Sequence, residues 1–200
     1  ARLLASLLAI LEMAQLPQFS EVASLMFRDI LNWGPAISGR FVAAFGLASF
    51  FGAQGTGALV DLLGPDLQAT LSHVCLAASF LMWGAARSSA TMLAMLLPLT
   101  LSFGRGIVVR SKAIARAEEL GLGRGEAMAA MGTLGAVTKV LAPRIFVALY
   151  SASSAQAGTG VARRRQALPT GAPMFFLAAL GVLVEALHRM AIRARQERCM

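Results

Sequence analysis

The chain has 200 residues, of which 57% are hydrophobic and 14% are charged, and its mean hydropathy is +0.68. Soluble domains carry about 25% charged residues, so this composition argues against a soluble protein. The net charge of +8 could suggest nucleic-acid binding, but the basic residues lie in short connections between apolar runs. No nucleic-acid-binding motif surrounds them, and basic residues beside anionic lipid are the better interpretation.

The apolar residues come in blocks of about 20, which is the helix length that crosses a hydrocarbon core. The sequence therefore predicts an all-α, multi-pass membrane protein with six transmembrane helices. These helices are expected at about residues 3–20, 36–59, 67–86, 90–109, 127–150 and 174–190. The chain starts inside an apolar run that Glu12 interrupts, and no signal-peptide cleavage site follows. We therefore expect a fragment of a longer membrane protein.

The segments between the predicted spans have distinct compositions. Residues 21–35 place apolar side chains at helical spacing, which indicates a helix along the membrane interface with Trp33 at headgroup depth. Residues 110–126 carry both signs of charge and are predicted to be a cytoplasmic loop, and residues 151–173 an extracytoplasmic loop. Residues 191–200 form a basic tail. Lysine and arginine are more numerous on the side that would hold both termini, which places the termini in the cytoplasm.

Two stretches resemble a known family. Residues 27–64 read FRDILNWGPAISGRFVAAFGLASFFGAQGTGALVDLLG and end in a G-x-x-x-D-x-x-G turn formed by Gly57, Asp61 and Gly64. Residues 123–150 combine a glycine-bearing loop, a stripe of small residues, and a proline followed by an apolar run. Together with the six spans, these stretches resemble the C-terminal half of a major facilitator superfamily transporter, in its tetracycline-resistance-like, drug:proton antiporter-like branch. The turn departs from that pattern because Leu62, Leu63 and Pro65 replace the usual basic residues.

The resemblance implies a function and an architecture. The first, second, fourth and fifth spans would line a central cavity, and a small solute would bind between two six-helix halves that rock in alternating access. The chain would then be part of a secondary active, proton-coupled transporter. Its partners would be a small-molecule substrate, protons, the lipid bilayer and an N-terminal half of six helices.

Lys139 and Arg144 are the charges that most need an explanation, because both lie in the fifth predicted span. Gly132 and Gly135 share a helical face with Lys139 and would allow close helix contact, so this face is expected to point inward. Lys139 could contact an anionic or polar substrate or a gating partner, or it could form a structural ion pair. Arg144 lies nearer the end of the span, and its side chain is expected to reach the headgroups. Pro143 frees a carbonyl one turn back and could mark a bend used in rocking.

Glu12 lies in the middle of the first predicted span, with Gln15 about one turn further on the same face. Two roles suit Glu12: the partner of Lys139 across the cavity, or the carboxylate that takes up the coupled proton. A third possibility is a hydrogen bond to the N-terminal half.

Other polar residues in the spans have simpler interpretations. Arg40 is expected to anchor the second span at the interface rather than bind substrate, and Asp61 to cap a helix end at the turn. His73 is interpreted as a packing histidine in preference to a proton relay. Glu185 and His188 are interpreted as a local pair near the end of the last span.

The sequence offers little support for an enzyme. The two histidines are far apart, and no H-E-x-x-H, G-x-S-x-G or paired acidic motif is present. Neither cysteine has other potential metal ligands at suitable spacing, so no metal or cofactor is expected. The alternative to transport is a transporter-derived membrane protein that senses, scaffolds or has decayed, and the weakened turn favours it.

Overall fold

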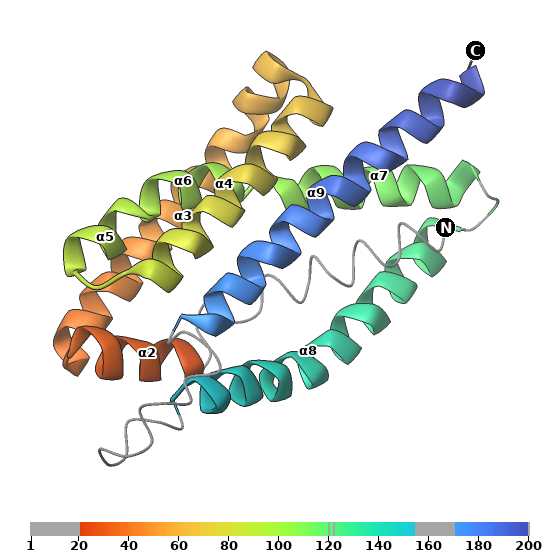
Figure 1. Ribbon diagram of the computed structural model, residues 1–200. Coiled ribbons are helices and arrows are strands. Elements are labelled where there is room, and N and C mark those ends of the chain that lie inside the picture. Colours follow the sequence, from red (N-terminus) through yellow and green to blue (C-terminus); the bar gives the residue numbers. More distant parts are fainter. Residues whose placement is uncertain (1–20, 120, 122, 155–170, 200) are drawn as a thin grey trace.

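The computed structural model describes residues 21–119, 121, 123–154 and 171–199, and their regular structure is helical throughout. The first predicted span, at 3–20, lies outside the described residues. The helices, shown in Figure 1, are α2 (Glu21–Leu31), α3 (Pro35–Leu63), α4 (Pro65–Ala85), α5 (Ser89–Ala94), α6 (Leu96–Ser102), α7 (Arg105–Glu119), α8 (Arg124–Ser154) and α9 (Ala172–Cys199).

Five helical stretches in the described residues are long and apolar enough to cross a membrane. They are Pro35–Leu63, Pro65–Ala85, Ser89–Ser111, Arg124–Ser153 and Ala172–Met190. The predicted class of an all-helical membrane protein is confirmed to this extent. A sixth span stays a prediction.

Helix α4 lies at the centre of the packed bundle and contacts α9, α6, α3 and α7. It begins directly after Gly64, the residue that separates it from α3. Gly64 has a φ of 78°, a conformation that side-chain-bearing residues rarely adopt, and its amide closes α3 on the Val60 carbonyl at 2.8 Å. Pro65 then occupies the first turn of α4, where its missing N–H removes no helical hydrogen bond. The two helices therefore form an antiparallel pair.

The fourth span consists of α5, α6 and the first part of α7, with helix breaks at Met95 and at residues 103–104. Glycine permits close packing around it: a Cβ on Gly52 of α3 would lie 2.2 Å from the Thr100 carbonyl oxygen. Helix α7 continues to Glu119, so most of the stretch predicted as a loop at 110–126 is helical. The run KAIARAEE consists mainly of good helix formers, which explains this helix despite its many charges.

Helix α2 ends at Leu31, and the next residue, Asn32, has a φ of 54°, in the left-handed region that asparagine tolerates better than most residues. The chain then turns, and the Trp33 side chain packs in an aromatic cluster with Phe27, Phe41 and Trp83. Trp33 is 7% exposed, and its indole N–H donates to the Ser89 hydroxyl at 3.0 Å. Trp33, which the sequence places at headgroup depth, is thus packed inside the protein, because four aromatic rings from three segments of the chain meet there.

Helix α8 lies along one side of the bundle, where it contacts α7, α9 and α2 (Figure 1). It is continuous through Pro143. Since proline has no N–H, the Lys139 carbonyl one turn earlier lacks its usual helical donor.

Candidate functional site

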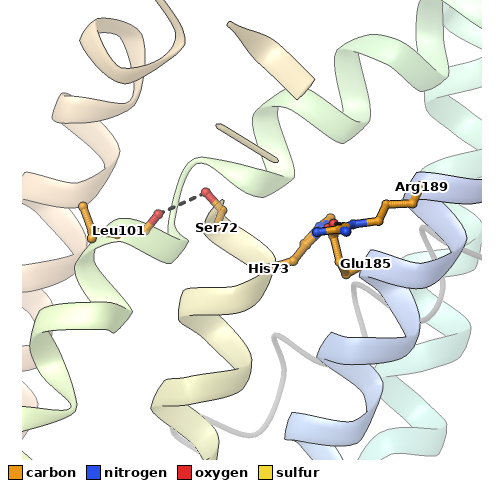
Figure 2. Close-up of polar contacts among 5 residues, drawn as sticks. All are labelled: Ser72, His73, Leu101, Glu185 and Arg189. Carbon is orange, nitrogen blue, oxygen red and sulfur yellow. Dashed lines mark hydrogen bonds and ion pairs between the residues drawn. The ribbon is translucent and has the colours of Figure 1, made fainter. Parts of the chain in front are cut away.

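A polar network that is largely buried joins α4 to α9. His73 of α4 has a fully buried side chain, and its Nδ1 lies 2.9 Å from Oε2 of Glu185 on α9. The other carboxylate oxygen of Glu185 accepts from Nε of Arg189 at 2.5 Å. Figure 2 shows His73 and Arg189 approaching the same carboxylate from two helices.

The geometry explains how Glu185 is accommodated in an apolar span. A carboxylate in such a span is costly unless a cation and hydrogen bonds compensate for its lost hydration. Arg189 is one turn further on α9, and its side chain is 58% exposed, so the network reaches the protein surface there. The interpretation of Glu185 and His188 as a local pair was incomplete: the closest partners of Glu185 are His73 and Arg189. His188 instead sets its ring edge-on to His73, with centroids 5.6 Å apart.

A second polar face of α4 points away from α9, toward α3 and α6. The Ser72 hydroxyl donates to the Leu101 carbonyl at 3.0 Å, and Figure 2 shows Ser72 and His73 directed at different neighbours. One turn before Ser72 lies Gln68, which is 0% exposed. Neither polar atom of the Gln68 side chain has a hydrogen-bond partner among the described residues. Gln68 lies beside the break in the fourth span, where a Cβ on Gly104 would be 2.5 Å from its Nε2.

Lys139 has a different environment. It lies at the middle of α8, inside the candidate span Arg124–Ser153, and it is exposed. Neither an ion pair nor a hydrogen bond joins its side chain to another described residue. Gly132 is exposed and Gly135 is buried, and no described atom lies within 4 Å of a Cβ built on either glycine. The close helix contact predicted for this face is not seen within the described part of the chain.

The remaining predicted site residues are spread over the molecule. Glu12 and Gln15 lie outside the described residues. Arg40 on α3 and Arg144 and Pro143 on α8 are exposed, as are Gly57 and Asp61 near the end of α3. Asp61 does not cap α4, because Gly64 is the N-cap residue and α4 starts without a side-chain cap. Gly64, by contrast, has a clear structural role, because its positive φ lets the chain turn between α3 and α4.

Another polar contact lies at the end of the bundle formed by α2. The Tyr150 hydroxyl of α8 donates to Oδ2 of Asp29 on α2 at 2.5 Å, and Nε of Arg28 donates to Oδ1 at 2.8 Å. Asp29 lies outside the candidate spans, and the Arg28 guanidinium, followed by the Tyr150 hydroxyl, holds the pKa of its carboxyl below the usual value.

Sequence reasoning missed the parts played by Gln68 and by the Asp29–Tyr150 pair. A glutamine within an apolar span is a visible signal for Gln68. The Asp29–Tyr150 contact joins positions 121 residues apart, and no local pattern could reveal it. In the described ranges, no group of three or more His, Cys, Asp or Glu side chains is placed to hold a metal ion.

Comparison of the chain with protein-family models, with curated proteins and with solved structures finds no match. The geometry of the protein itself therefore carries the functional argument.

Proposed function

We propose that this chain is a membrane domain of a secondary active transporter for small solutes, which works by alternating access and is coupled to protons. In this proposal the chain pairs with a second six-helix half, and the solute binds between the two halves. The five membrane-length helices supply the scaffold that such a domain needs.

The observation that supports transport best is the position of Lys139. An ammonium group in the middle of a span is costly in lipid, so such residues face a partner or a water-filled cavity. The bundle offers Lys139 no described anion, although the same bundle supplies Glu185 with the Arg189 cation and with the His73 ring. A hydrated cavity beside α8 would accommodate the charge, and an anionic or polar group of a solute would bind it there.

The other candidate residues take secondary roles in this proposal. Glu12 would pair with Lys139 or carry the coupled proton, with Gln15 beside it. Arg40 and Arg144 would both hold their helices at the outer headgroup layer. Pro143 would allow α8 to bend, because the Lys139 carbonyl is already free of its helical hydrogen bond.

Uptake into proteoliposomes tests the proposal. The full-length protein is reconstituted, a pH gradient is imposed, and entry of radiolabelled organic anions is measured, since Lys139 is a cation. We expect Lys139→Ala to reduce uptake at least tenfold while the unfolding temperature in detergent stays the same. Arg144→Ala, on the same helix, is the matched control and should retain most uptake. Equal uptake by wild type and Lys139→Ala would contradict the proposal.

A charge swap tests the partner of Lys139. If Glu12 and Lys139 form a pair, Glu12→Lys and Lys139→Glu should each abolish uptake, and the double variant should recover part of it. A double variant as inactive as either single variant would count against the pair.

The second candidate function is a transporter-derived protein that does not transport. The exposed Asp61, with no basic residue in the three positions after it, favours this alternative, because the charged turn of the family would be incomplete. Solute binding without uptake in the same proteoliposomes would support it.

A further inference from the structure

Several residues of α8 share one side of the helix with Lys139. At 100° per residue, Gly132, Phe146 and Tyr150 lie within about 20° of Lys139 around the helix axis, and Gly135 within about 40°. We call Gly132, Gly135, Lys139, Phe146 and Tyr150 the lysine stripe. The stripe runs along α8 towards α2, and Tyr150 lies about 16 Å beyond Lys139.

The two halves of the lysine stripe have different neighbours. Near α2 the stripe is covered: Phe146 is 1% exposed and sets its ring edge-on to Phe176 of α9, with centroids 6.0 Å apart. The Tyr150 hydroxyl is bonded to Asp29 of α2. At Gly132 and Gly135, a Cβ built on the glycine would meet no described neighbour within 4 Å.

The Asp29–Tyr150 hydrogen bond has the features of a contact that can form and break. Arg28 keeps the carboxylate ionised, which strengthens the bond from the tyrosine hydroxyl. The Asp29 side chain is nevertheless 40% exposed, so water can replace the tyrosine when the helices separate. Helix α2 has 11 residues and is followed directly by the left-handed Asn32, so a small backbone change there would move Asp29 relative to α8.

We infer that the Asp29–Tyr150 hydrogen bond is the latch of a gate that closes the α2 end of the lysine stripe and controls access to Lys139 from that side of the membrane. This inference rests on the proposed transport function, since a gate matters for a protein with a cavity. The aromatic pair Phe146–Phe176 forms the apolar part of the closure, and the latch forms the polar part.

Thiol labelling of the full-length protein in sealed vesicles tests the latch. The reporter is Lys139→Cys in a background with Cys75→Ala and Cys199→Ser, and Ala36→Cys, at an exposed position beside the end of α2, identifies the side. A membrane-impermeant maleimide is added from that side. A hydrogen bond to an ionised group shifts an equilibrium by about tenfold, so Tyr150→Phe and Asp29→Ala should each raise the labelling rate by about that factor.

Ser151→Ala is the matched control, because the Ser151 hydroxyl bonds the carbonyl of Val147 on its own helix. It should leave the labelling rate unchanged. The double variant should label no faster than either single variant, because both remove the same contact. If Tyr150→Phe and Asp29→Ala both unfold the protein or both label at the wild-type rate, the latch is overturned. Labelling requires no transported solute. Unchanged labelling of the variants with intact wild-type uptake therefore removes the latch alone, and faster labelling of the variants with no uptake by the wild-type protein removes the transport proposal alone.

Discussion

The α4–α9 interface and the lysine stripe both place ionisable residues inside membrane-length helices, but they treat the charge differently. At the interface, Glu185 receives hydrogen bonds from His73 and from Arg189, and one end of the network reaches the surface. On the stripe, Lys139 has no described counterion. The difference suggests two uses of intramembrane charge: a carboxylate that is paired within the bundle holds helices together, and under the transport proposal a charge that the described bundle leaves unpaired would meet a solute.

The largest effect is expected from breaking the α4–α9 network. Glu185→Leu leaves His73 buried without its acceptor, and loss of one partner of a buried pair costs about 3 kcal/mol or more. The variant should unfold at a clearly lower temperature in detergent. Adding His73→Leu should recover much of that loss, because an apolar pair of similar size needs no partner.

The contrast between the α4–α9 interface and the lysine stripe would weaken if Glu185→Leu proved as stable as the wild type. It would also weaken if a folded His73→Leu, Glu185→Leu variant lost uptake entirely, since the network would then serve transport.

Glycine substitutions compare packing in the two regions. In Gly52→Ala the new methyl group meets the Thr100 carbonyl oxygen, and overpacking of this kind costs about 1 to 3 kcal/mol. In Gly132→Ala the methyl group meets no described atom, and alanine favours the helix by up to about 1 kcal/mol. Unfolding temperatures of the two variants should therefore move in opposite directions. A large loss in Gly132→Ala would show that another segment packs against the lysine stripe.

Gln68 differs from the other polar residues of α4, because it is buried and its amide has no hydrogen-bond partner among the described residues. Removing an unsatisfied buried group relieves its desolvation cost, so Gln68→Leu should stabilise the protein by about 1 kcal/mol. The matched variant Ser72→Ala removes a hydroxyl that is bonded, and it should destabilise by about the same amount. A destabilised Gln68→Leu would mean that a bound water or solute satisfies the amide.

The smallest effect concerns pH at the α2 end. The pKa of the Asp29 carboxyl is lowered by Arg28 and Tyr150, so its contribution to stability is present above the ordinary aspartate pKa of about 4. The contribution disappears as the pH falls through the lowered pKa. Asp29→Asn should therefore reduce the unfolding temperature slightly at neutral pH and leave it unchanged in strong acid. The same difference at both pH values would contradict this assignment.

Sequence patterns were reliable where the evidence is local. The repeated apolar blocks predicted the helical membrane class, and each predicted span from the second to the sixth overlaps a candidate span of the structure. The G-x-x-x-D-x-x-G stretch showed where two helices meet, and Gly64 turns the chain there. The structure decided the finer points: the fourth span is broken, α7 replaces most of a loop, and Trp33 is buried.

The amino-acid sequence alone predicts several membrane-length helices with a few charges among them, because helix length and hydrophobicity are properties of consecutive residues. The packing of the helices decides which polar and charged side chains have a partner. Glu185 is joined to a histidine 112 positions earlier, and Tyr150 to an aspartate 121 positions earlier. Such pairs depend on how helices pack across the bundle, and no spacing along the chain encodes that arrangement.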